Sequence, residues 1–385
     1  MFIIFTVGVV WLLYVYFGYP ALLAILGKLY AIRPSRSTDI LPHVSVLLSA
    51  RNEKEDIGWK LAETLAWDYP AEKLEILVAS DASDDGTDEI IRGFDNRGVK
   101  PFRMETRVGK NAALNLMEQY ASGEILFFTD ANANIAPGIL RSMVQHFGDS
   151  RVGCVTGSTC PATDDHNARI GHGAGVYERY ETLIFKLESK IGSVLVCDGA
   201  IFAIRRELFQ PLLPELSDDL ELAIRISAAG YWTVFESQAM VLERDTSSAR
   251  EEFRRRRRMG ATGVLGMWKL RRELWGFRGF QFVSHKFLRW LTLVPMLMIL
   301  MSTAFMFRQP LMAALLVAQV AFYASALVAL SLAILGRRVR RLFAVPFYIL
   351  LGAAGTLMGM FEPLFGKRYH IWEIAPLSRG HREVT

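Results

Sequence analysis

Four long stretches of this sequence carry no charged side chain, and they restrict the fold more than any other feature. Each has at least 18 residues, and they cover residues 2–27, 290–307, 309–336 and 342–361. A helix of about 20 apolar residues crosses the roughly 30 Å hydrocarbon core of a bilayer. Residues 28–289 lie between the first two stretches and are polar enough and long enough for a folded domain. The pattern predicts one membrane helix before this domain and about three after it, which excludes a purely integral channel.

The positive charge gathers next to the apolar stretches. The chain has a net charge of +5, and arginines cluster at residues 254–258, at 271–272 and within 337–341. Basic clusters beside membrane helices favour cytoplasmic retention and contact with anionic lipids. Nucleic-acid binding is the weaker interpretation, because no aromatic residues for base stacking alternate with these arginines. We therefore expect membrane lipids, and no nucleic acid, among the partners.

The basic residues also predict on which side of the membrane the domain lies. Lys28, Arg33 and Arg36 follow the first apolar stretch, and the positive-inside bias then places residues 28–289 in the cytoplasm. We expect a multi-pass protein of the cell (inner) membrane with a cytoplasmic catalytic domain. Three further crossings would carry the basic tail, with Arg379 and Arg382, to the outer side. A re-entrant or interfacial course of residues 342–361 would avoid this, and the sequence leaves that choice open.

Residues 31–265 alternate between short apolar runs and helical patterns. The apolar runs cover residues 44–49, 74–79 and 125–129, and apolar residues recur at helical spacing over 55–67, with another helix expected over 88–94. Alternating strands and helices predict an α/β fold with a mostly parallel sheet. Ligands bind such sheets beyond the carboxyl ends of the strands. We therefore expect the loops that follow these runs to share one crevice.

Polar side chains follow the apolar runs in those loops. Asp81 comes after the second run, and Asp130 and Asn132 come after the third. A carboxylate at Asp81 suits a ribose hydroxyl or a base N–H, whereas Asp130 with an oxygen of Asn132 suits a hard divalent cation on a diphosphate. Lys110 lies at a predicted helix start, which favours anions. Each motif alone is more typical of a turn, a cap or a loop, but their order after the strands predicts a nucleotide site.

Five motifs follow one another along the chain. They are LSARNE (48–53), SDASDDGT (80–87), GKNAALN (109–115), TDAN (129–132) and SDDLELAIR (217–225). Together with residues 198–206 and 284–290, they resemble the membrane-bound family 2 glycosyltransferases, the clan of the cellulose, chitin and hyaluronan synthases. The resemblance implies a GT-A (Rossmann-like) domain that uses a nucleotide-diphosphate sugar, most often a UDP-sugar, with Mg²⁺ or Mn²⁺. It also implies a glycan or lipid-linked acceptor and a role in polysaccharide or envelope glycan synthesis.

The resemblance assigns donor-binding roles to five residues. Glu53 and Asp81 match positions that contact the nucleoside, and Lys110 matches one that contacts the nucleotide. Asp130 and Asn132 match the positions that hold the metal and the diphosphate.

The resemblance also implies a mechanism. Asp219, with Asp218 before it, matches the base that takes a proton from the acceptor hydroxyl as its oxygen attacks the anomeric carbon, with inversion. Arg255 and Arg258 stand where the family has Q-x-x-R-W, whose arginine stabilises charge on the departing diphosphate. Outside this context, Asp218 and Asp219 are more typical of the first turn of a helix.

Four positions depart from the family pattern. Asn132 replaces the second acidic residue of D-x-D and lowers the charge of the site by one. Met259 replaces a tryptophan, which removes an aromatic platform for a terminal acceptor sugar and weakens the prediction of processive polymerisation. Arg255 replaces a glutamine, and Asp218 replaces a glutamate.

Two other classes of function fit the sequence less well. A transport or scaffold protein that binds nucleotide without transferase activity would carry paired ionisable residues inside its membrane helices, and the uncharged stretches hold none. A nucleotidyltransferase would need a glycine-rich phosphate loop near the first strand, which residues 50–55 do not provide.

The predicted domain organisation has five parts. Residues 266–286 mix tryptophan and phenylalanine with arginine, which is typical both of an amphipathic segment in the lipid headgroups and of one that packs its aromatic face on the soluble domain. We expect the following division: an N-terminal transmembrane anchor (1–30), a GT-A catalytic domain (31–265), an interfacial amphipathic segment (266–286), a C-terminal transmembrane region of about three segments (287–365) and a tail (366–385).

Overall fold

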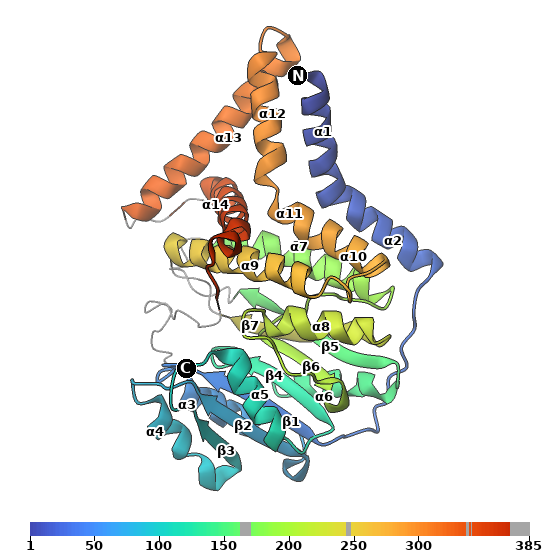
Figure 1. Cartoon of the computed structure of the whole chain (residues 1–385), viewed down its shortest axis with the longest axis vertical. Helices are drawn as coiled ribbons and strands as arrows, with labels where there is room; N and C mark the ends of the chain where they lie inside the picture. Colours follow the sequence, from blue (N-terminus) through green and yellow to red (C-terminus); the bar gives the residue numbers. More distant parts are fainter. Residues whose placement is uncertain (162–170, 244–247, 336–338, 340, 370–385) are drawn as a thin grey trace.

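The chain forms a layered α/β domain from which several helices project (Figure 1). The computed structural model describes residues 1–161, 171–243, 248–335, 339 and 341–369. The predicted basic loop at 337–341 and the tail at 366–385 therefore lie largely outside the described residues. The helices that project from the domain are α1 (Phe2–Leu13), α12 (Leu293–Phe305) and α13 (Pro310–Ile334).

A seven-stranded sheet forms the centre of the α/β domain. Its strand order is β3-β2-β1-β4-β6-β5-β7. All neighbouring pairs are parallel except those of β6, which runs antiparallel to both β4 and β5. The mostly parallel α/β sheet predicted from the sequence is therefore confirmed. The strands are β1 (Val44–Ala50), β2 (Leu74–Ser80), β3 (Val99–Arg103), β4 (Ile125–Asp130), β5 (Val152–Pro161), β6 (Ile201–Arg205) and β7 (Trp232–Glu243).

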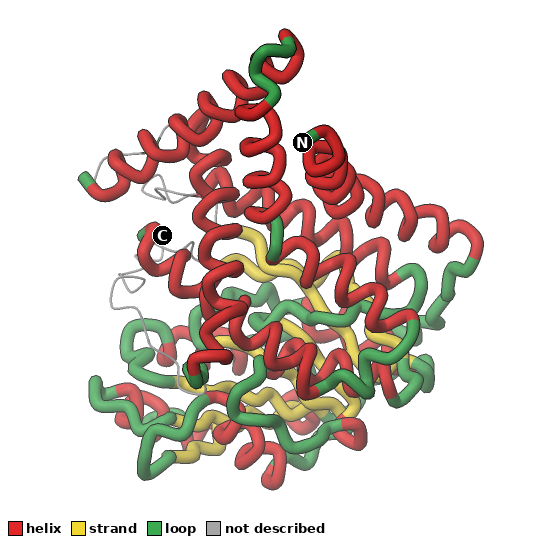
Figure 2. Tube along the Cα trace, turned by 45° about the horizontal axis from the view of Figure 1, so that its top comes forward, coloured by secondary structure: helices red, strands yellow, loops and turns green. Residues whose placement is uncertain are grey.

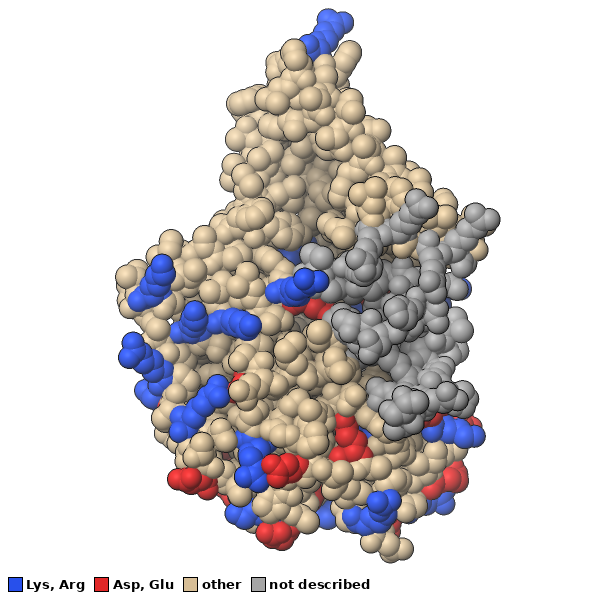
Figure 3. Space-filling view, turned by 180° about the vertical axis from the view of Figure 1, so that it is seen from behind, with Lys and Arg blue, Asp and Glu red and all other residues tan. Residues whose placement is uncertain are grey.

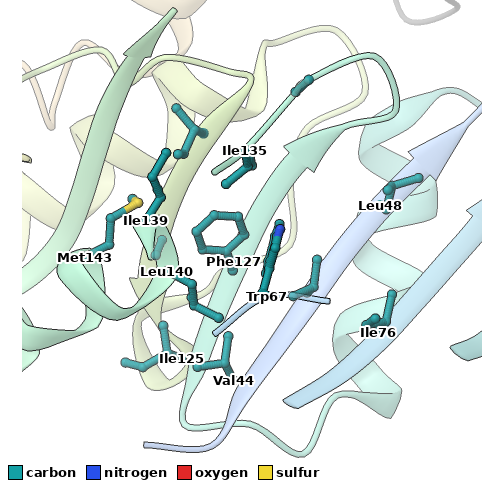
Figure 4. Close-up of a cluster of buried hydrophobic side chains, with 14 of the residues drawn as sticks. Val44, Leu48, Trp67, Ile76, Ile125, Phe127, Ile135, Ile139, Leu140 and Met143 are labelled. Carbon is teal, nitrogen blue, oxygen red and sulfur yellow. The ribbon is translucent and has the colours of Figure 1, made fainter. Parts of the chain in front are cut away.

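Helices cover both faces of this sheet, so its central strands are apolar on both sides. Because successive side chains point to opposite faces of a strand, Val46 and Leu48 join one core and Leu47 joins the other. The first core includes α3 (Ile57–Leu65), α4 (Thr87–Arg92) and α6 (Ile139–Val144), and the second includes α5 (Lys110–Tyr120) and α8 (Asp218–Ala228). In the first core Trp67 meets Phe127 edge to face, with ring centroids 5.3 Å apart (Figure 4).

The projecting helices are apolar on their outer surfaces. Three stretches are long and apolar enough to cross a membrane: Phe2–Leu29, Pro310–Ile334 and Leu342–Phe365. The first joins α1 to α2 (Tyr19–Leu29) through a π-helical turn. Figure 3 shows that the projecting part is almost free of charged side chains, and Figure 2 shows it standing clear of the sheet. The apolar stretches predicted at both ends of the chain are therefore helices, as expected.

The helix α12 is shorter than its uncharged stretch. Its 13 residues span about 20 Å at 1.5 Å per residue, and the chain before it bends by 56°. The preceding helical segment, Phe277–Trp290, contains α10 (Phe277–Phe282), a π-helical turn and α11 (Leu288–Trp290). The second predicted span, residues 290–307, thus corresponds mainly to α12, which is the second helix of a bent pair that begins at Phe277.

A buried cluster of charges fastens these helices to the domain. Glu181 of α7 (Gly171–Ser189) accepts from Lys286 at 3.0 Å and also contacts Arg289 and His285. The hydroxyl of Tyr19 on α2 donates to Glu188 of α7 at 2.6 Å. Breaking a buried ion pair leaves an uncompensated charge, at a cost of about 3–5 kcal/mol. The cluster therefore fixes how the apolar helices sit on the domain.

The segment 266–286, predicted as an interfacial amphipathic segment, is not one helix. It contains the end of α9 (Ala249–Lys269), turns over 270–276 and α10. Leu270, Leu274 and Phe282 are buried in a core with α8, whereas Trp268 and Trp275 are 69% and 82% exposed. The exposed tryptophans suit a headgroup region, and the buried leucines hold the segment on the domain.

Candidate functional site

The loops after the parallel strands meet at one edge of the sheet. The loop after β1 and the loop after β2 are joined by two hydrogen bonds between Asn52 and Asp84, at 2.7 and 3.0 Å. Arg51 adds to this connection by donating to the main-chain carbonyl of Asp81 at 2.7 Å. The two loops therefore form one unit beside β4, whose carboxyl end carries Asp130.

Lys110 is the centre of the candidate site. It is the first residue of α5, after Gly109, whose φ of +92° lies in the region that favours glycine. Its Nζ lies 2.9 Å from Oδ1 of Asp130 and 3.1 Å from Oδ2 of Asp218. Burial alone would lower the pKa of Lys110, but the two carboxylates raise it above its usual value. The side chain is therefore a fixed positive charge that joins the end of β4 to the start of α8.

Asp218 and Asp219 form the first turn of α8. The N-cap is Ser217, so the acidic pair lies where the helix dipole favours negative charge. Burial raises the pKa of both carboxyl groups. The charge of Lys110 lowers the pKa of each carboxyl group, whereas the charge of Asp219 raises the pKa of Asp218. A carboxylate with a raised pKa is a stronger base than an exposed aspartate.

The side chain of Asp219 has one oxygen engaged locally. Its Oδ1 accepts from the main-chain N–H of Leu220 at 2.8 Å. Its Oδ2 faces Gly199, where a Cβ atom would lie 3.5 Å from it. The main-chain carbonyl of Asp219 accepts from Cys197 N–H at 3.2 Å. The stretch 198–206, which is part of the family resemblance, thus begins directly beside this carboxylate.

Arg258 approaches the same carboxylates from α9. Burial and the neighbouring Arg255 lower the pKa of its guanidinium, while Asp130, Asp219 and Asp218 oppose this. The charges of these three aspartates therefore favour the protonated guanidinium of Arg258. Arg255 also acts on Asp198, whose pKa burial raises and Arg255 lowers. A role of Arg255 and Arg258 in binding the donor stays a prediction.

Asp81 supports the loop that carries Lys110. Its two carboxylate oxygens accept from the main-chain N–H groups of Val108 and Gly109, at 2.7 and 3.0 Å. The side chain is buried. Glu53 is half-buried in the loop after β1, and its main-chain N–H donates to Thr87 at 2.8 Å. Contact of Asp81 and Glu53 with a nucleoside stays a prediction.

Metal binding rests on a small set of donors. Among the described residues, no group of three or more His, Cys, Asp or Glu side chains is placed to hold a metal ion. Asp130 is 22% exposed at its side chain, and Asn132 is half-buried two residues later. Mg²⁺ commonly takes one or two protein carboxylates and completes its shell with water and substrate phosphates. One carboxylate and one amide oxygen beside an anionic substrate fit that pattern, with the metal competing against the ammonium of Lys110.

One half-buried acid beside the site was missed by the sequence analysis. Asp198 accepts from the main chain of Thr159 at 2.6 Å and from its hydroxyl at 2.8 Å. The charge of Arg255 lowers the pKa of Asp198, and the charge of Asp198 raises the pKa of Asp219. The sequence indicated Asp198 only as the first residue of the 198–206 motif. Its contact with Thr159 could not be predicted, because Thr159 lies on β5, about 40 residues earlier in the chain.

Comparison with known proteins agrees with this site and fold. The profile of glycosyl transferase family 2 matches residues 45–213. The probable glycosyltransferase YdaM of Bacillus subtilis is 27% identical over 64% of this chain and 57% of its own length. The β-monoglucosyldiacylglycerol synthase of Trichormus variabilis is 34% identical over 30% of this chain and 25% of its own length. The chain thus spans at most a little over half the length of these two curated relatives.

A solved structure shares the fold over nearly the whole chain. The mannosyltransferase PcManGT of Pyrobaculum calidifontis, solved with GDP-Man and Mn²⁺, aligns with a TM-score of 0.68 at 24% identity. The alignment covers 92% of this chain and 99% of that one. From the sequence profile and this shared fold, we conclude that the chain contains a glycosyl transferase family 2 domain built on the GT-A fold.

Proposed function

We propose that this protein moves a sugar from a nucleotide-diphosphate sugar, of which a UDP-sugar is the first candidate, to a hydroxyl group of an acceptor at the membrane. The observation that carries the proposal is the contact of Lys110 with both Asp130 and Asp218, at 2.9 and 3.1 Å. It gathers the acidic residues of two motifs that are far apart in sequence. The match of residues 45–213 to the profile of glycosyl transferase family 2 supports sugar transfer as the reaction type.

Asp219 is the proposed general base. Its carboxylate would take the proton of the acceptor hydroxyl while that oxygen forms a bond to the anomeric carbon. The bond from the anomeric carbon to the phosphate oxygen breaks, and its electron pair leaves with the diphosphate, which inverts the configuration. Burial, which raises the pKa of this carboxyl, strengthens it as a base. Asp218 is fixed by Lys110 and would hold the start of α8 in place.

The cations of the site are proposed to act on the leaving group. Negative charge grows on the diphosphate as the bond breaks, and a buried guanidinium stabilises that charge more strongly than an exposed one. Arg258, which is half-buried, is the main candidate, and the exposed Arg255 is the second. A divalent cation held by Asp130 and Asn132 would supply further charge neutralisation when bound. That the similar mannosyltransferase was solved with Mn²⁺ is consistent with such a requirement.

The acceptor is proposed to be a glycan or a lipid-linked molecule. The exposed Trp268 and Trp275, with the apolar helices α1 and α13, suit attachment of the domain to a bilayer. A domain bound to the cytoplasmic face of the cell membrane would meet acceptors whose anchors lie in the bilayer. A glycolipid synthase is among the relatives that share part of the domain.

A screen of donors tests the proposal. The full chain is purified in detergent and incubated with a panel of UDP-, GDP- and TDP-sugars, Mn²⁺ or Mg²⁺ and extracted membrane lipids, and nucleoside diphosphate release is measured. We expect one donor to give acceptor-dependent release that EDTA abolishes. Nucleotide binding without release from any donor would instead support the transport or scaffold alternative and overturn the proposed transfer.

A further inference from the structure

The five consecutive arginines of α9 lie in different environments. Residues two apart on an α-helix point in nearly opposite directions, since each residue turns the helix by about 100°. The helix packs on α8 beside the candidate site, because a Cβ atom at Gly266 would lie 2.6 Å from Leu220 Cδ2, and the charges of Asp130, Asp218 and Asp219 act on Arg258. Arg256 and Arg257 face α14 (Arg341–Phe361), and Arg254 is exposed to solvent. The helix thus connects the candidate site with α14.

Two side chains at α14 hold the arginines on that second face. The hydroxyl of Tyr348 accepts from Arg256, whose guanidinium also donates to Glu252 at 2.6 Å and lies 4.2 Å from the ring centroid of Tyr177. Glu362, in the turn that directly follows α14, accepts from Arg257. Arg256 and Glu362 are buried. Arg256 and Arg257 therefore each have a defined hydrogen-bond partner on α14 or in the turn after it.

The backbones of the two helices touch. A Cβ atom at Gly359 would lie 2.0 Å from the carbonyl oxygen of Arg257, and one at Gly260 would lie 2.2 Å from the carbonyl oxygen of Thr356. Both values are far below the spacing that a real Cβ tolerates, so only glycine permits this approach. At Gly355, one turn earlier, a Cβ atom would still lie 2.8 Å from Arg256 Cβ, whereas at Gly352, about two turns before Gly359, the nearest atom would be Arg256 Nε at 3.9 Å. The close contact therefore covers the second half of α14, from Gly355 onward.

The course of α14 follows from these contacts. Figure 1 shows α14 nearly end-on, whereas α1 and α12 run along the long axis of the molecule. A helix that lies along a row of arginines would be costly to place in the centre of the bilayer. The contacts with Arg256 and Arg257 instead favour an interfacial course for α14.

We propose that α14 is a positioning element of the candidate site: Tyr348, Gly359 and Glu362 fix α9 in the place from which Arg258 reaches the acidic cluster. The inference rests on the proposed function, because it assigns α14 a role in stabilising the leaving diphosphate. None of these three residues touches the reacting atoms. They act through α9 and through Arg258.

A pair of matched substitutions on α14 tests the role. Gly359→Ala forces the helices apart by about 1 Å, because the new Cβ cannot approach a carbonyl oxygen to 2.0 Å. Gly352→Ala makes the same chemical change on the same helix with an ordinary contact of 3.9 Å. With the donor found in the screen, we expect Gly359→Ala to lower kcat about 10- to 100-fold with little change in KM for the donor. Gly352→Ala should stay within about twofold of the unchanged chain.

A double-substitution cycle separates positioning from a general loss of structure. If α14 acts through Arg258, then Gly359→Ala should lower kcat by less than about twofold in a chain that already carries Arg258→Ala. Independent losses that multiply in the double variant would overturn the inference. So would an unchanged kcat in Gly359→Ala. Tyr348→Phe and Glu362→Gln provide a second pair that removes one contact each without forcing the backbones apart.

A distance measurement keeps the inference testable without activity. Nitroxide labels are placed at two exposed positions, Arg254→Cys on α9 and Lys100→Cys on β3, in a chain whose native cysteines are replaced by alanine. Pulsed electron resonance should show a shift of about 1 Å or more in Gly359→Ala and none in Gly352→Ala. If the unsubstituted chain releases no diphosphate from any donor, the proposed function fails, and this measurement still decides whether α14 sets the place of α9. Equal distances in both variants would overturn the positioning role.

Discussion

Replacing Lys110 by methionine removes the cation that two acidic residues share. Lys110 Nζ contacts Asp130 and Asp218 at 2.9 and 3.1 Å, and the lysine and Asp218 side chains are 10% and 7% exposed. Methionine keeps most of the length of the side chain but has no charge. The change therefore leaves the carboxylates of Asp130 and Asp218 close together without their nearest positive charge. Asp219 follows Asp218 directly and adds a third negative charge.

The expected loss of stability is large for one residue. Removing one partner of a buried ion pair costs about 3–5 kcal/mol, which for a domain of this size lowers Tm by on the order of 10 °C. Lys100→Met is the matched control. Its amine pairs with Glu75 at 2.7 Å, but the lysine side chain is 53% exposed, and an exposed pair contributes about 0–1 kcal/mol.

The loss should also depend on pH in a defined direction. Burial already raises the pKa of Asp218, and Lys110 partly opposes that rise. Without the lysine the pKa of Asp218 rises further, so the folded state of the variant binds a proton that the unfolded chain releases. Its stability then increases as the pH falls through that raised pKa, because a neutral carboxyl needs no cation. The deficit should be largest near neutral pH and smallest in acid.

Thermal unfolding in detergent, followed from about pH 7.5 to pH 4.5, measures this deficit for both variants. The reasoning is refuted if Lys110→Met costs no more than Lys100→Met. A full deficit that does not change across this pH range would also refute it, because the cost would then come from lost packing and not from charge.

Three further predictions concern other parts of the protein. Burial alone would raise the pKa of Glu75, but hydrogen bonds from Lys100 and two serines lower it to about 2; its stabilisation is therefore present above its ordinary pKa and lost as the pH falls toward 2. Glu75→Gln should lower the free energy of unfolding by about 1–3 kcal/mol at neutral pH and leave it unchanged near pH 2. An equal loss of free energy at neutral pH and at pH 2 would contradict this. Arg258→Ala should lower kcat about 100- to 1,000-fold, whereas Arg254→Ala, exposed on the same helix, should leave kcat unchanged; equal losses would show that helix charge alone matters. EDTA should stop diphosphate release, and Asn132→Asp should keep or raise metal affinity in calorimetric titration with Mn²⁺, so release that is indifferent to EDTA counts against a metal.

The strands that carry the site were predictable because their signal is local. Residues 44–50, 74–80 and 125–130 are apolar runs that end in polar loops, and each is a buried parallel strand. The helix start at Lys110 was also predicted, since Gly109 precedes it. The strand β3 was missed because Val99–Arg103 is short, polar and contains a proline. Such a strand is tolerated at the edge of a sheet, which is where β3 lies.

The contacts within the site were not predictable from the sequence. The pairing of Lys110 with Asp218 joins helix starts that are separated by three strands of the chain. The antiparallel direction of β6 also depends on tertiary packing. The contact between α9 and α14 was not predicted either, because the close approach at Gly359 depends on residues that are about 100 positions apart in the sequence.

The most direct test of the central claim is diphosphate release by Asp219→Asn, measured beside the binding of UDP with Mn²⁺ to the same purified chain. Asparagine has nearly the same shape as aspartate but cannot take the proton of the acceptor hydroxyl. The proposed mechanism predicts that acceptor-dependent release is lost while the Kd for UDP stays within about threefold. Unchanged release in Asp219→Asn would contradict the assignment of this carboxylate as the base on which the proposed transfer depends.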